Sequence, residues 1–193
     1  MKSRVRIGYQ VDFPPFMYRD ETPAGLVIEA LASSIEALHG LAIDVDWVPL
    51  SLGGQEKALI DGHVDMLAAL GMTPERASRM VFGEPLVRTG GALFAKPGTG
   101  LVERIVTPTS GPLRQPTREA FPQCDVLDAD DYPDALAKVL AGQADAAALN
   151  LQVGGIVAER EHAGVFELPS ELFAVVDLAP AFAPAHAGTL GRL

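Results

Sequence analysis

The chain has 193 residues, of which 48% are hydrophobic and 21% charged, with a single cysteine, so it is neither a disordered nor a disulfide-stapled chain. It holds 15 lysines and arginines against 25 aspartates and glutamates, and a formal net charge of −10 without a Lys/Arg-rich run excludes nucleic acid as an expected partner. No apolar stretch approaches the roughly 20 residues of a membrane-spanning helix, and the length allows one domain or two small lobes.

The first half of the chain alternates between strand and helix patterns. In chain order the predicted elements are a strand at 5–9, a helix at 25–39 ended by Gly40, a strand at 43–47, a helix at 55–61 and a strand at 64–70. Two prolines keep the loop at 12–16 out of helices and central strands. Thr73 as N-cap and Pro74 as the first helical residue predict one more helix. Strands that alternate with helices indicate the α/β class.

The second half restarts this alternation. Its predicted elements are a strand at 93–96, a strand at 105–106, a helix around 117–121, a strand at 126–127, a helix at 134–141, a buried strand after Asp145 and a return strand at 181–183. The Pro-Gly-Thr-Gly segment at 97–100 is the best linker candidate.

A long repeat relates the two halves. Residues 62–65 precede a buried apolar strand, and 80 positions later residues 142–145 do the same. In both copies the glycine fits a turn that ends a helix, and we interpret Asp65 and Asp145 as groups that brace this turn rather than as catalytic groups. Two copies at so long a period predict two similar lobes, not a solenoid.

Five motifs follow one another over residues 5–97. They are Asp-Phe-Pro-Pro-Phe at 12–16, a helix led by Gly25, Ala-Leu-Ile-Asp-Gly-x-x-Asp at 58–65, Gly-Met-Thr-Pro-Glu-Arg at 71–76 and Phe-Gly-Glu-Pro at 82–85. In this order they resemble the family 3 extracellular solute-binding proteins of bacterial ABC transporters. The second half, at 109–111 and 140–145, matches that family more loosely.

The resemblance implies a two-lobed, type II periplasmic-binding-protein-like clamshell of α/β lobes that closes on a small solute. Lobe 1 is expected to comprise residues 1–95 with 179–193 returning to it, and lobe 2 residues 96–178. The family usually continues with helices that pack on the first lobe, and we expect these to be truncated here. Apolar surface left without them predicts self-association.

Arg76 is the main candidate binding residue. A cation in the first turn of a helix opposes the helix dipole, and an anion held by the guanidinium would explain its position. The alternative is a surface ion pair with Glu75, Glu84 or another carboxylate. The resemblance implies that Arg76 holds the α-carboxylate of an amino acid, with Thr73 and the Gly71 backbone beside it. We expect Arg76 to face an open, wet cleft, so that its loss abolishes binding but hardly lowers stability.

Three further candidates come from loops. Phe13 is expected as an apolar wall facing the ligand, with core packing as the alternative, whereas Phe16 is expected to pack inside the lobe. Ser110 and Gly111 could offer a hydroxyl and a backbone N–H from the second lobe, and a plain Ser-Gly-Pro turn is an equal alternative.

Asn150 occupies the place where the resemblance implies an aspartate that pairs with the ammonium of the ligand. A neutral amide gives up much of that charge-assisted contact, which predicts weaker or different selectivity. In the alternative interpretation Asn150 only caps the strand end or binds the loop at Gly154.

The predicted function is capture of a small carboxylate-bearing solute, an amino acid or a related compound, for ABC-transporter uptake or for sensing. The transporter's membrane subunits are the expected protein partners. No cofactor or metal is expected, because the histidines are scattered and no dinucleotide motif occurs. Two alternatives stay open: an enzyme similar to the cyclohexadienyl dehydratases, with Glu29 and Glu84 as available acids, and a degenerate copy that binds nothing. A removed leader implies a periplasmic or extracytoplasmic location, and a native start at Met1 a cytoplasmic one.

Overall fold

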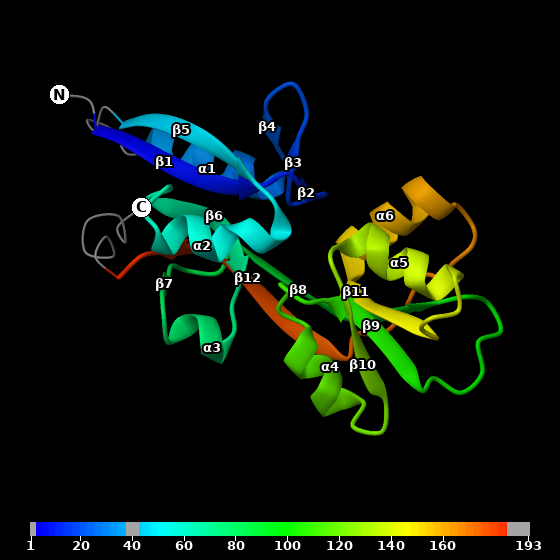
Figure 1. Ribbon diagram of the computed structural model, residues 1–193. Coiled ribbons are helices and arrows are strands. Elements are labelled where there is room, and N and C mark those ends of the chain that lie inside the picture. Colours follow the sequence, from blue (N-terminus) through cyan, green and yellow to red (C-terminus); the bar gives the residue numbers. More distant parts are fainter. Residues whose placement is uncertain (1–2, 38–42, 185–193) are drawn as a thin grey trace. The chain divides into compact units, whose positions relative to one another are not determined.

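The computed structural model describes residues 3–37 and 43–184, so the helix end predicted at Gly40 lies outside the described residues. The chain divides into two compact units, one formed by Met1–Arg88 with Asp177–Leu193 and the other by Thr89–Val176. Two strands, β8 (Val87–Ala95) and β12 (Ala174–Phe182), carry the chain from one unit into the other (Figure 1).

The first unit contains a parallel sheet built from the predicted strands. Strand β1 pairs in parallel with both β5 and β6, and the unit's part of β12 runs antiparallel beside β6. Within this unit the elements are β1 (Ser3–Gln10), β2 (Asp12–Phe13), β3 (Met17–Arg19), β4 (Pro23–Ala24), α1 (Leu26–Ala37), β5 (Ile43–Leu50), the short 3-10 helix η1 (Leu52–Gly54), α2 (Gln55–Ile60), β6 (Met66–Gly71), α3 (Pro74–Ala77) and β7 (Val81–Phe82).

A buried apolar cluster holds α2 against the sheet of the first unit. Every residue of β6 is buried, which agrees with the continuous apolar run that predicted a strand there. The cluster consists of Ala58, Leu59, Val64, Leu67, Leu70, Met80 and Ala181. It fixes the position of α2 relative to the ends of the parallel strands, where the candidate site lies.

The second unit repeats this arrangement. Strand β9 pairs in parallel with β10 and β11, and β8 runs antiparallel beside β11. Its elements are β9 (Arg104–Pro108), α4 (Arg114–Ala120), β10 (Asp125–Ala129), α5 (Tyr132–Leu140), β11 (Ala146–Asn150) and α6 (Leu151–His162), which follow β8 in the chain. The alternation of strands and helices confirms the predicted α/β class.

The repeated turns do what the sequence predicts. Gly62 and Gly142 both have φ of +71°, a conformation that favours glycine after a helix. Asp65 accepts hydrogen bonds from the backbone and guanidinium of Arg6, and Asp145 accepts the same pair from Arg104. The bracing role of both aspartates is therefore confirmed.

Two segments differ from expectation. The 97–100 segment, predicted as a linker, lies inside the second unit, where it forms the turn between β8 and β9. The residues after Asn150 form the 12-residue helix α6 rather than a loop. Two adjacent glycines hid this helix, because glycine lowers intrinsic helix propensity by about 1 kcal/mol per residue.

Candidate functional site

The carboxyl ends of β1, β5 and β6 lie at one edge of the first unit's sheet, because the three strands are parallel neighbours. Gln10 ends β1, Gly71 ends β6, and α2 begins shortly after β5. In α/β folds this edge is where ligands meet the sheet. Most of the first-unit candidates predicted from the sequence lie here.

Arg76 is placed by the one-turn helix α3. The Thr73 side chain accepts a hydrogen bond from the Arg76 backbone N–H, with Oγ1 and N 3.1 Å apart, and Pro74 occupies the first helical position. Both features were predicted from the sequence. The cap fixes the backbone of Arg76, and the side chain that extends from it is only 6% exposed.

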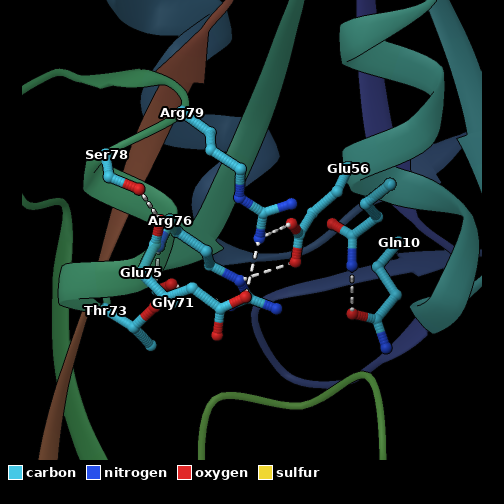
Figure 2. Close-up of polar contacts among 9 residues, drawn as sticks. Gln10, Glu56, Gly71, Thr73, Glu75, Arg76, Ser78 and Arg79 are labelled. Atoms are coloured by element: carbon cyan, nitrogen blue, oxygen red, sulfur yellow. Dashed lines mark hydrogen bonds and ion pairs between the residues drawn. The ribbon is translucent and has the colours of Figure 1, made fainter.

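The Arg76 guanidinium is held by a carboxylate and a carbonyl of its own unit (Figure 2). Its Nε lies 2.9 Å from Oε1 of Glu56, and its Nη1 donates to the carbonyl of Gly71 at 2.8 Å. The other carboxylate oxygen of Glu56 accepts from Arg79 at 3.0 Å. These contacts set the plane of the guanidinium.

This environment corrects two expectations about Arg76. The residue is buried, not in open contact with water. Its ion pair with Glu56 on α2 agrees with the alternative interpretation, which expected a carboxylate partner. The argument from the helix dipole also fails, because α3 has only 4 residues and its first turn is also its last. The loss of Arg76 is therefore expected to cost stability, since the Gly71 carbonyl loses its side-chain donor.

Phe13 lies in the short strand β2, which follows β1, and packs against Phe16. Their ring centroids are 5.5 Å apart and the rings are tilted by 42°. Both side chains are buried, at 8% and 3% exposure. The structure therefore shows Phe13 in contact with Phe16, the residue that was expected inside the lobe.

Three polar residues beside Arg76 escaped the sequence analysis. Glu56 pairs with the guanidinium, and Gln55 donates from Nε2 to Oε1 of Gln10 at 3.0 Å. Gln10 in turn donates to Asp12, again at 3.0 Å. The available signal was the polar pair Gln55 and Glu56 at the start of a helix whose buried face also contains Ala58 and Leu59.

In the second unit the candidates lie at the corresponding strand ends. Ser110 and Gly111 follow β9, and Asn150 ends its parallel neighbour β11. The Gly111 N–H donates to the carbonyl of Pro108 at 3.1 Å, so the structure uses this donor in the turn that was the alternative interpretation.

Asn150 is the N-cap of α6. Its side-chain oxygen accepts from the backbone N–H groups of Gln152 and Val153, at 3.1 and 3.2 Å, and its Nδ2 donates to Thr89 Oγ1 at 2.9 Å. The Thr89 hydroxyl in turn donates a hydrogen bond to Oε1 of Gln152. A capping role was the alternative interpretation, although the element that it caps is a helix and not a strand end.

The shifted carboxyl pKa values belong to ion pairs that include none of these candidate residues. A hydrogen bond from Arg104 lowers the pKa of Asp145, and one from Arg88 lowers the pKa of Asp177. Within 3–37 and 43–184, no group of three His, Cys, Asp or Glu side chains could hold a metal ion. In the same ranges no helix is long and apolar enough to span a membrane.

Comparison with known proteins gives one family match and many structural matches. The sequence profile of the bacterial extracellular solute-binding proteins, family 3, matches residues 5–168. No curated protein sequence matches the chain.

Solved proteins of similar structure are about one fifth identical to this chain in sequence. The periplasmic VFT2 domain of Bordetella pertussis BvgS has a TM-score of 0.81 at 22% identity, over 97% of this chain and 84% of that one. An ancestral arginine-binding protein bound to glutamine has a TM-score of 0.81 at 22% identity, over 100% and 89%. The ancestral amino acid-binding protein AncCDT-1, a precursor of cyclohexadienyl dehydratase, has a TM-score of 0.76 at 20% identity, over 98% and 86%.

Proposed function

The chain belongs to family 3 of the bacterial extracellular solute-binding proteins, and we propose that it captures a small molecule through the carboxylate of that molecule. The family and the periplasmic-binding-protein fold predicted from the sequence are both confirmed. Two of the similar structures are named as amino acid-binding proteins, which favours an amino acid or a close relative as the ligand of this chain.

The observation that carries the proposal is the orientation of the buried Arg76 guanidinium. Bonds to Glu56 and to the Gly71 carbonyl fix its plane at the edge of the sheet where parallel strands end. A guanidinium fork matches a carboxylate in two parallel hydrogen bonds. A guanidinium that is already immobilised loses less conformational entropy when it binds a ligand.

The charges around Arg76 favour an anion. Glu56 accepts from Arg76 with one oxygen and from Arg79 with the other, so one carboxylate is shared by two guanidinium groups. Glu75 also pairs with Arg79, so these four side chains carry two positive and two negative charges. Arg76 is the most buried of the four, with a side chain 7% exposed, and a buried charge interacts more strongly with an opposite charge than an exposed one does.

The other predicted site residues are proposed as supporting contacts. The Thr73 hydroxyl keeps its O–H as a donor while its oxygen caps α3, and Gly71 acts through Arg76 rather than directly. Phe13 is proposed as an apolar contact. In the second unit Ser110 is proposed as a hydroxyl contact.

Gly111 and Asn150 are proposed with reduced roles. The Gly111 N–H is shared with its turn, and Asn150 acts mainly by holding the start of α6.

An enzyme on the same fold is the second candidate. The named precursor of cyclohexadienyl dehydratase motivates it. Both acids that could serve, Glu29 and Glu84, are exposed, whereas a general acid is usually tuned by burial or by a charged neighbour. We therefore propose binding without catalysis.

A ligand panel tests the proposal. Purified protein is incubated with amino acids and with the same carboxylic acids lacking the amine, and unfolding is followed by thermal shift. A specific ligand at a hundred times its Kd is expected to stabilise the protein by about 2.7 kcal/mol. No stabilisation by any carboxylate contradicts the proposal and favours a degenerate copy, and turnover of prephenate or arogenate favours the enzyme.

The biological setting is proposed from the family alone. We propose an extracytoplasmic protein that delivers its ligand to the membrane subunits of an ABC transporter or acts as a sensing domain. Self-association is proposed through exposed apolar side chains of the first unit, among them Ile60, Val81 and Leu86. Sedimentation analysis that shows only a monomer at high protein concentration contradicts the proposed self-association.

A further inference from the structure

A buried oxygen on α2 has no hydrogen-bond partner among the residues that the structure describes. It is Oε1 of Gln55, whose side chain is nearly fully buried at 3% exposure of the residue. A buried acceptor without a donor destabilises the fold, because the hydrogen bond that water would give it is not replaced. Such a group calls for a donor that the described protein does not supply.

The chemistry of its neighbours identifies this atom as an acceptor. Asp12 ends the chain of hydrogen bonds with a carboxylate, which only accepts, so the NH2 group of Gln10 must face it at 3.0 Å. The carbonyl of Gln10 then faces Gln55 and accepts a hydrogen bond from the NH2 group of Gln55, also at 3.0 Å. The remaining oxygen of the Gln55 amide is therefore fixed as a carbonyl.

The two hydrogen bonds run in one direction, from the amide of Gln55 to that of Gln10 and from there to the carboxylate of Asp12. Each amide that donates a hydrogen bond becomes a better acceptor at its own carbonyl. The negative charge of Asp12 thus strengthens the Gln55 carbonyl as an acceptor without placing a charge beside it. A carbonyl of this kind attracts N–H and O–H groups and repels a second carboxylate.

The position of Gln55 connects it to the proposed binding site. It is the residue before Glu56, which pairs with Arg76, and Gln10 ends the strand between β5 and β6. Both groups thus lie at the carboxyl edge of the same three parallel strands.

We propose that Gln55 is a specificity-determining residue that accepts a hydrogen bond from an uncharged N–H or O–H donor at the end of the ligand remote from its carboxylate. This inference rests on the proposed function, in which Arg76 holds that carboxylate. It selects ligands with a carboxamide or hydroxyl end. Ligands with an apolar or carboxylate end of the same size bind more weakly.

The test compares probes of matched size. One set contains L-asparagine, L-aspartate and L-leucine, and the other L-glutamine, L-glutamate and L-methionine, each also without its α-amine. Calorimetric titration of the wild-type protein is expected to give an affinity for the carboxamide at least about tenfold above that for the other two members, in the set whose length fits.

Three variants separate this role from a structural one. Gln55→Met is expected to reduce the preference to within about threefold, mainly by improving binding of the apolar probe. Gln55→Glu keeps the size and an acceptor oxygen, and it is expected to shift the preference toward L-lysine or L-ornithine. The control Gln115→Met, at a glutamine that pairs with Glu119 on the surface of α4, is expected to leave all affinities unchanged.

The outcomes distinguish this inference from the function on which it rests. Equal affinities of carboxamide and apolar probes in the wild type, or a preference that survives both Gln55 variants, overturn the role of Gln55 and indicate that a buried water supplies its donor. Binding of other carboxylates but of none of these probes also overturns it. Absence of any carboxylate binding contradicts the proposed function itself.

Discussion

Replacement of Asn150 by alanine removes three hydrogen bonds at the start of α6. Two come from the backbone N–H groups of Gln152 and Val153, and the third joins Nδ2 to Thr89. Loss of a helix N-cap costs about 1 kcal/mol. Thr89 is 3% exposed and loses a buried donor, which costs about 1 kcal/mol more.

The sum of these two effects is about 2 kcal/mol, or a fall of about 4–8 °C in Tm for a chain of this length. Urea unfolding followed by circular dichroism measures it. Asn150→Asp keeps the capping oxygen, because aspartate caps a helix as well as asparagine does, while it loses the Nδ2 contact and places a charge at a buried position. An alanine variant within 0.5 kcal/mol of the wild type would refute the capping role of Asn150.

Three further predictions concern packing, pH and reactivity. Gly154→Ala is expected to lower the free energy of unfolding by about 1–3 kcal/mol in the same urea assay, because a Cβ there meets the Phe94 ring at 2.6 Å. Gly155→Ala is expected to raise it by about 0.5–1 kcal/mol, because a Cβ there meets nothing closer than 3.8 Å. The pKa of Asp145 is lowered in the folded protein, so its contribution is present above the unfolded pKa of about 4 and is lost as the pH falls through the folded value; Asp145→Asn should flatten the acid limb of stability against pH. Burial raises the pKa of the Cys124 thiol, so iodoacetamide should modify it at pH 7 more slowly than free cysteine, and equal rates would contradict this.

Local chemistry made part of this structure predictable from the sequence. Thr73 and Pro74 predict the start of α3, because a cap and its helix lie within a few residues of each other. The bracing aspartates were predictable for a related reason, since the repeat placed Asp65 and Asp145 after identical glycine turns.

Contacts between distant segments were not predictable in this way. Glu56 reaches Arg76 only because α2 packs beside the end of β6. The sequence around Glu56 does not indicate this partner, and neither does the sequence around Arg76. The expectation of a wet Arg76 failed for this reason.

Helix α6 was missed because a packing requirement overrode propensity. Gly154 weakens the helix pattern, yet the Phe94 ring leaves no room for a side chain at that position. The cap signal at Asn150 was present in the sequence.

The most direct test of Arg76 as the carboxylate-binding residue is a calorimetric cycle. The tightest ligand of the panel and its methyl ester are titrated into the wild type and into Arg76→Met, after circular dichroism has shown that the variant folds. Arg76 as the carboxylate-binding residue predicts that the wild type prefers the free carboxylate by at least about tenfold and that the variant has lost this preference, because the ester cannot form the charge-assisted pair. A preference for the carboxylate that persists in the folded variant would contradict it.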